Sequence, residues 1–202
     1  DDQESIYLDL LSELERADQL LAANQGAING DILFGGDIRK WRKFGNALRL
    51  RLIMHASKQL PDAAGRFQQI ASNLPIPESN EDNVVLTYTG TFPNEYPLIP
   101  LKTGDFDAVA IGKAATDIME AYQDPRLLRY ARPNNEDFEN NPEFIGAVNG
   151  QGEECSKSGA SRLGVQYYNY PGLTRASDLD LPIADGIILT YSEVAFLLAE
   201  AA

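Results

Sequence analysis

The sequence predicts a mainly α fold with long irregular segments. Apolar residues recur at helical spacing near both ends of the chain and again around residues 106–122. Prolines recur between residues 75 and 100, where only 84–89 has the composition of a strand. Asn, Gly, Asp and Ser dominate residues 133–186, which we interpret as a large ordered loop region.

The chain of 202 residues is long enough for one domain with a sizeable core, and 44% hydrophobic residues are typical of a globular protein. We therefore expect one domain over 1–202, part of a larger fold. Its expected parts are a helical hairpin at 1–60, helices and loops at 61–132, the loop-rich insertion at 133–186, and the start of a further helix pair at 190–202.

The first helix is expected over about residues 3–23. Its apolar residues follow i, i+3, i+4, i+7 spacing, while acids occupy the other side. Asp1 stands three residues before Glu4, as in a capping box. The expected core residues of this helix are Tyr7, Leu10, Leu11, Leu14, Ala17 and Leu21.

A second helix is expected after "DILFGGD", with Asp37 as its N-cap and Gly35 and Gly36 as turn residues. The spacing is not that of a phosphate-binding loop, and the Asp37 carboxylate would repel a phosphate. Pro61 marks the end of this segment. Its expected core residues are Ile38, Trp41, Phe44, Leu48 and Leu52.

Charge links these two helices. The first is rich in Asp and Glu, whereas the second carries seven of the seventeen basic residues with Lys58 included. We expect the acidic helix to fold back on the basic one as an antiparallel hairpin. This also accounts for the basic cluster without nucleic acid, because a net charge of −13 repels a polyanion.

Two helices are expected in the middle of the chain, at about 62–73 and 106–122. The second should present Ile111, Ala115, Ile118, Met119 and Tyr122 on one face and should end at Asp124-Pro125-Arg126. We expect the side chain of Arg126 to bond to a carboxylate or to helix-end carbonyls.

The last helix is expected to begin at Tyr191. Thr190 and Glu193 form a capping box, and Leu189 with Val194 forms the matching hydrophobic staple. Its apolar face continues to the final residue, so we expect the chain to be a piece of a longer protein.

Other classes of site have little support. The sequence has no apolar run of about 20 residues and no signal peptide at its start. One cysteine, Cys155, and one histidine, His55, provide no zinc cluster, and no nucleophile elbow accompanies His55. We expect no metal and no cofactor, although a calcium site in the acidic loop stays open.

Four segments in this order resemble the SusD/RagB family of Bacteroidetes outer-membrane lipoproteins. They are "DDQESIYLDLLSELERADQLL", "LFGGDIRKWRKFGNALRLRLIMHAS" and the pair "DPRLLRY" and "LTYSEVAFLLAEAA". The resemblance covers 1–202 and is most specific at 31–57 and 188–202. The structural signature residues of this pattern are Gly36, Asp37, Trp41, Asn46, Arg49, Arg51, Asp124, Arg126, Thr190 and Glu193.

The resemblance implies tetratricopeptide-like helix pairs with irregular insertions that carry the ligand site. It also implies a non-enzymatic protein that binds glycans or other nutrients at the cell surface and acts as a lid over a TonB-dependent, SusC-like transporter. The lipid-bearing N-terminal cysteine and the C-terminal portion of the family are absent from this sequence, so an anchor to the membrane cannot be read from it.

Two loop segments have the composition of a glycan site, which needs exposed rings beside amides and carboxylates. "GVQYYNYPG" and "TGTFPNEYPLIP" both alternate aromatic and polar residues, and prolines limit the entropy lost on binding in the second. The candidate ligand residues are Phe92, Asn94, Tyr96, Tyr167, Tyr168, Asn169 and Tyr170.

Two other functions stay open from the residues alone. A helical-repeat scaffold could bind a peptide or protein in the groove between helix pairs. A glycoside hydrolase needs only two suitably separated carboxylates, but the number of acids here makes that signal uninformative.

Overall fold

The computed structural model describes residues 2–24, 26, 28–88, 109–135, 137, 140–150, 159–164 and 185–202. The chain divides into two compact units. The frame unit comprises Asp1–Thr87 and Gly186–Ala202, and the inserted unit comprises Tyr88–Asp185. Each unit is described by itself below.

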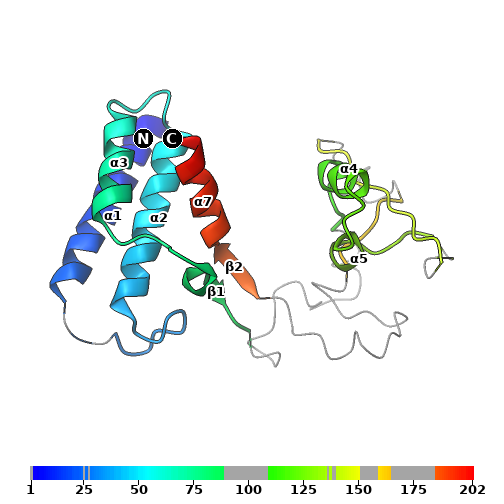
Figure 1. Ribbon diagram of the computed structural model, residues 1–202, viewed down its shortest axis with the longest axis horizontal. Helices are drawn as coiled ribbons and strands as arrows, with labels where there is room; N and C mark the ends of the chain where they lie inside the picture. Colours follow the sequence, from blue (N-terminus) through cyan, green and yellow to red (C-terminus); the bar gives the residue numbers. More distant parts are fainter. Residues whose placement is uncertain are drawn as a thin grey trace. The chain divides into compact units, whose positions relative to one another are not determined.

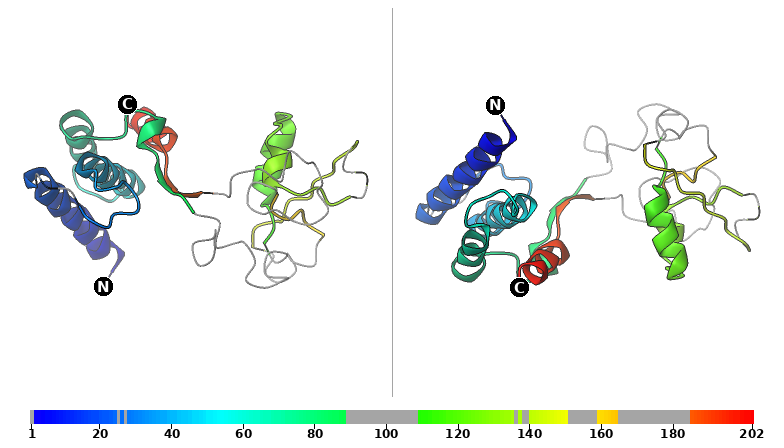
Figure 2. Two further views of the ribbon diagram at one scale, coloured as in Figure 1. Left: turned by 90° about the horizontal axis from the view of Figure 1, so that it is seen from below. Right: turned by 90° about the horizontal axis from the view of Figure 1, so that it is seen from above.

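Helices make up most of the frame unit, which confirms the predicted mainly α fold. They are α1 (Gln3–Ala23), α2 (Ile38–His55), α3 (Ala63–Asn73) and α7 (Tyr191–Glu200). Helix α2 packs against α1, α3 and α7 and is therefore central (Figures 1 and 2). The core around it contains Leu11, Ala47, Leu50, Ile53, Leu60, Phe67, Ile70, Val84, Leu189, Val194 and Leu197.

Side-chain caps define the starts of three helices. Asp37 accepts from Lys40 N at 3.1 Å, and Thr190 accepts from Glu193 N at 3.3 Å, as predicted. The cap of α1 was predicted wrongly: Asp2, not Asp1, accepts from Ser5 N at 2.7 Å. Asp2 has the extended backbone of an N-cap and directly precedes the first helical residue.

The buried face of α2 differs from the predicted one. Trp41, Phe44, Leu48 and Leu52 are only partly buried. The fully buried residues are Lys43, Asn46, Ala47, Arg49, Leu50 and Ile53. Because three helices surround α2, its core face includes polar side chains whose hydrogen bonds are made inside the protein, and apolar periodicity does not find such positions.

A two-stranded antiparallel sheet closes the frame unit. Strand β1 (Val84–Leu86) pairs with β2 (Gly186–Leu189), with Leu86 opposite Gly186 and Val84 opposite Leu189. A short 3₁₀ helix, η1 (Asn80–Asp82), precedes β1. The main chain thus leaves the frame unit after β1 and returns to it through the neighbouring strand.

The inserted unit has two described helices, α4 (Lys113–Ala121) and α5 (Leu127–Tyr130). Ile111, Leu127 and Ala131 form its small core with Met119, Tyr130 and Phe144. Isolated bridges join Ala110 to Arg162, Gly112 to Ala147 and Ala131 to Leu163.

The predicted helix at 106–122 is partly wrong. Residues 106–108 lie outside the described residues, and the helix begins only at Lys113. Ile111 is buried, but in an extended segment and not in a helix, since its backbone N–H donates to Ser161 O. On α4, Thr116 is the buried side chain and Ile118 is 60% exposed, while Tyr122, which directly follows the helix, is 82% exposed. The helix ends before Asp124, as predicted.

Candidate functional site

The seven predicted ligand residues, Phe92, Asn94, Tyr96, Tyr167, Tyr168, Asn169 and Tyr170, lie outside the described residues. All seven belong to the inserted unit by sequence. The structure does describe the two parts of the frame unit between which the inserted unit lies in the sequence: the residues that lead into β1, and β2 with the start of α7.

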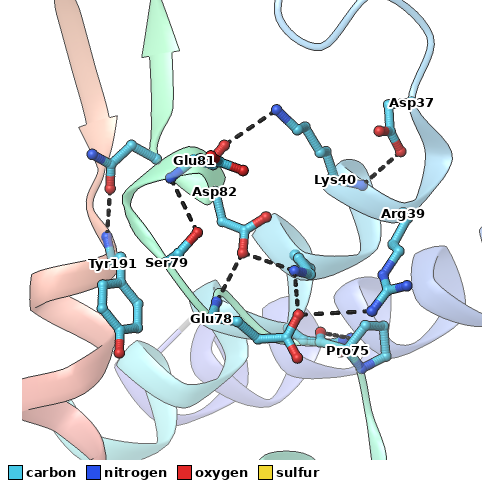
Figure 3. A network of polar contacts seen from close by, with 12 residues as sticks. Asp37, Arg39, Lys40, Pro75, Glu78, Ser79, Glu81, Asp82 and Tyr191 are labelled. Atoms are coloured by element: carbon cyan, nitrogen blue, oxygen red, sulfur yellow. Dashed lines mark hydrogen bonds and ion pairs between the residues drawn. The ribbon is translucent and has the colours of Figure 1, made fainter.

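Residues 75–83, which we call the anchor loop, lead into β1 and are fastened to α2 by a lysine. Lys43 Nζ donates to Glu78 Oε2 at 2.6 Å and to Asp82 Oδ2 at 2.7 Å (Figure 3). The Lys43 and Asp82 side chains are only 9% and 10% exposed. Asp82 also accepts from Glu78 N, and Lys40 Nζ donates to Glu81 O. The loop therefore has a fixed position on α2.

The charges in this network stabilise one another. Burial by itself lowers the pKa of Lys43, but hydrogen bonds to Asp82 and Glu78 outweigh it and raise the pKa. Burial likewise raises the pKa of Asp82, but the hydrogen bonds from Lys43 and from the backbone, together with the charge of Lys43, outweigh burial and lower the pKa. Both groups therefore stay charged at neutral pH, which a structural tether requires.

Asn46 joins α1, α2 and the anchor loop. Its fully buried amide Nδ2 donates to Asp18 Oδ1 and to Pro75 O, each at 3.1 Å, and its Oδ1 accepts from Arg49 Nη1 at 3.2 Å. Asp18 is also held by Arg42, at 2.8 Å from Nε. Acidic α1 therefore folds back on basic α2, as the charge pattern predicted.

The chain that returns through β2 is fixed at the start of α7. Asn83 Oδ1 accepts from Tyr191 N at 2.7 Å, which links the anchor loop to the start of this helix (Figure 3). Arg51 on α2 donates from Nε and Nη2 to the two carboxylate oxygens of Glu193. The Glu193 carboxylate is thus bonded to α2. Of the two hydrogen bonds of the expected capping box, the one from Glu193 N to the Thr190 hydroxyl is made.

Sequence reasoning missed Asp31. Its carboxylate accepts from Leu33 N at 2.9 Å, from Gly36 N at 2.8 Å and from Trp41 Nε1 at 2.8 Å. An Asp before a glycine-rich turn is the signal that could have identified it, since such side chains bond to nearby backbone N–H groups. The rings of Trp41 and Phe34 pack edge to face, with their centroids 5.1 Å apart. Asp31 and these two rings therefore fix the turn before α2.

In the inserted unit, Arg126 bonds to a carboxylate, one of the two partners expected. Its Nε lies 2.9 Å from Asp124 Oδ1. Chiefly this side-chain hydrogen bond, with that from Arg126 N, lowers the pKa of Asp124 to about 2. Arg126 is exposed, so the pair shapes the turn after α4 rather than a buried site.

Two cavities lie side by side along α1. One, of about 360 Å³, is lined by the first turns of α1, by His55 and by residues 59–61. The other, of about 340 Å³, lies between α1 and α3 over α2 and includes Arg49. Leu8 contributes to both.

Neither a metal cluster nor a membrane span is found in the described part of the chain. No three His, Cys, Asp or Glu side chains there are placed to hold a metal ion. No described helix combines the length and apolar character needed to cross a bilayer.

The arrangement defines a class of protein: a helical scaffold that carries a large insertion between two paired strands. The model of the SusD-like family, described as "Starch-binding associating with outer membrane", matches residues 1–202. The chain therefore belongs to this family, whose solved members have helical, tetratricopeptide-like folds.

Solved structures agree with this assignment. Two SusD homologues from Bacteroides fragilis are similar to the chain, with TM-scores of 0.79 and 0.73 at 27% and 26% identity. Each match covers 100% of this chain and 44% of the homologue. A chitin-binding protein matches with a TM-score of 0.67 at 25% identity over 100% of this chain and 43% of its own. No curated protein matches the chain.

The chain thus spans less than half the length of these solved relatives. The family description is one of binding and of association with the outer membrane.

Proposed function

We propose that this protein binds glycans at the cell surface and delivers them to a TonB-dependent, SusC-like transporter in the outer membrane. The observation that carries the proposal is the family match over residues 1–202, with its description of starch binding at the outer membrane. In this proposal the protein is not an enzyme, and a lipid anchor outside this sequence holds it at the membrane.

The frame unit supports this role physically. Buried or bidentate contacts inside the frame unit fix the anchor loop, β1 and β2, from which the chain continues into the inserted unit. A site built on loops is precise only when rigid elements hold the loop ends. We assign glycan contact to Tyr167, Tyr168, Asn169 and Tyr170, and to Phe92, Asn94 and Tyr96, because rings and amides suit the C–H faces and hydroxyls of sugars.

Starch and chitin are the glycans to test first. The family description names starch, and one structural neighbour at 25% identity binds chitin. Native gels cast with soluble starch or a soluble chitin derivative should retard the protein. A Tyr167→Ala/Tyr168→Ala variant should bind about thirtyfold more weakly, since each of the two stacked rings contributes about 1 kcal/mol.

Tyr122→Ala is the matched control, because this tyrosine is 82% exposed and directly follows α4. It should bind like the wild type, and circular dichroism should show that all variants are folded. Equal retardation of the wild type and the Tyr167/Tyr168 variant would remove these tyrosines from the site. Absence of binding to every glycan in a broad panel would contradict the function itself.

The delivery step needs a separate measurement. Cells that carry the double tyrosine variant should import a fluorescent oligosaccharide more slowly than wild-type cells, at equal surface amounts of protein. A reducing-sugar assay should stay at background. Sustained sugar release that one Asp or Glu substitution abolishes would contradict the non-enzymatic assignment.

A further inference from the structure

The cavity between α1 and α3 has the features of a second ligand site. Its volume of about 340 Å³ is within the range of small-molecule pockets. Leu11, Ile53 and Ile70 supply an apolar part, while Arg49, Arg66 and Gln69 supply a polar part. All these residues belong to the frame unit, apart in sequence from the proposed glycan contacts.

Arg49 is a buried cation with few acceptors. Its side chain is only 7% exposed, yet Nε is buried without a hydrogen-bond partner. Nη1 donates to the neutral amide of Asn46, and Nη2 lies 3.6 Å from Glu15 Oε2, beyond hydrogen-bond length. A guanidinium has five N–H donors, and a buried charge is costly unless it is paired at close range.

The two partly buried arginines of α2 are paired better. Arg42 and Arg51 each make two hydrogen bonds to one carboxylate, Asp18 and Glu193 respectively. The shortfall at Arg49 is therefore specific to this residue among the three.

The charge balance in the cavity also favours an anion. Arg66 on α3 adds a second positive charge, and Glu15 is the one acid among the lining residues. The cavity thus carries a net positive charge in a protein whose formal net charge is −13. Such a local reversal of sign selects a carboxylate rather than a cation.

We propose that this cavity binds a carboxylate attached to a small apolar body. The carboxylate displaces Glu15 from its loose pair with Arg49 and is held by the guanidinium groups of Arg49 and Arg66. The apolar body contacts Leu11, Ile53 and Ile70. This chemistry occurs in a free short-chain carboxylic acid and in a peptide C-terminus with an apolar last residue.

NMR titration of the whole ¹⁵N-labelled chain tests the proposal. The probes are octanoate for the free acid and N-acetyl-leucine for the peptide terminus, with N-acetyl-leucine amide as the uncharged control. A carboxylate should give saturable shifts of the Arg49 Nε–H and Gln69 amide signals at concentrations up to roughly 10 mM. A response to octanoate alone identifies the free acid, and one to N-acetyl-leucine alone identifies the peptide terminus.

Three substitutions of exposed residues sharpen the test. Arg66→Gln should weaken binding about tenfold through loss of a charged hydrogen-bond donor. Glu15→Gln should strengthen it roughly three- to tenfold, because it removes the competing carboxylate. Arg16→Gln is the control, since this neighbour is paired with Glu13 and does not line the cavity. An Arg49→Met variant is informative only where it still folds.

Several results would overturn the proposal. They are the absence of shifts with both carboxylates, equal shifts with the amide, or affinities that Arg66→Gln and Glu15→Gln leave unchanged.

Discussion

At the scale of single residues, Asp31 organises the turn that starts α2. Four donors reach its carboxylate: the N–H groups of Leu33, Phe34 and Gly36 and the indole of Trp41. Partial burial by itself raises the pKa of Asp31, but hydrogen bonds led by that from Gly36 outweigh it and lower the pKa from 3.8 to about 2. The charged form is therefore the one that the fold stabilises.

The stabilisation by Asp31 should depend on pH. Because the folded pKa lies below the unfolded one, the contribution is complete above about pH 4 and is lost as the pH falls toward about 2. An Asp31→Asn variant should unfold at a lower urea concentration than the wild type at pH 6. The gap between the two midpoints should shrink steadily between pH 4 and pH 2.

Asp124 titrates in the same range, so it needs a control. Asp124→Asn in the inserted unit should leave the Trp41 fluorescence transition of the frame unit unchanged. If the urea midpoints of the wild type and Asp31→Asn differ by the same amount at every pH, that result would contradict the role given to the Asp31 charge.

Adjacent glycines offer a matched pair in the same turn. Both have positive φ, +63° at Gly35 and +90° at Gly36. A Cβ at Gly36 would lie 2.7 Å from Ile28 O, whereas one at Gly35 meets nothing within 4 Å. Gly35→Ala should cost about 1 kcal/mol, and Gly36→Ala about 2 kcal/mol or more because a backbone clash adds to the strain.

Urea unfolding followed by Trp41 fluorescence measures both values. Equal costs for the two alanines would show that the turn can move away from the clash.

At the scale of elements, the apolar pattern located α1, α2, α3 and α7 correctly, and the caps predicted for α2 and α7 are confirmed. The pattern failed where polar side chains are buried: Lys43, Asn46 and Arg49 are on the core side of α2, and hydrophobicity alone assigns them to the surface. It also failed in α4, where backbone pairing of Ile111 with residues 147 and 161 takes the place of the first helical turns. Such partners are distant in sequence and cannot be read from local spacing. The seven candidate ligand residues stay a prediction.

The tie between α2 and the anchor loop should carry a measurable free energy. Lys43→Met leaves Asp82, which is 10% exposed, without its cationic partner. We expect a loss of about 2–3 kcal/mol in the free energy of unfolding, because a buried charge loses its partner. Lys40→Met is the control, since Lys40 donates to a backbone carbonyl at the surface and should change stability by less than about 0.5 kcal/mol.

A double variant separates charge from packing. Asp82→Asn added to Lys43→Met should recover part of the lost stability in urea unfolding. No recovery would mean that the loss came from packing of the lysine stem.

At the scale of the whole molecule, the frame unit has its own core, and its two chain segments meet in a strand pair. Leu86 lies opposite Gly186, so a two-residue turn could connect these positions. Replacement of residues 87–185 by Asn-Gly should give a folded helical protein, since the frame core contains no residue of the inserted unit.

Circular dichroism and a cooperative urea transition would show this folding. The shortened protein should bind no glycan, which links the proposed activity to the inserted unit. A molten or aggregated product would instead show that the frame unit depends on contacts outside itself.

The pairing of distant segments also has a kinetic consequence. The Asn83–Tyr191 and Arg51–Glu193 hydrogen bonds join residues 108 and 142 positions apart. Contacts between residues so far apart form late in folding, because closing the long loop between them costs entropy before the contacts can stabilise the fold. During synthesis α1, α2 and α3 emerge long before α7, so the core surface that Val194 and Leu197 later cover stays open in the nascent chain. Helix α7 then adds its buried side chains to a core that the first three helices have already begun.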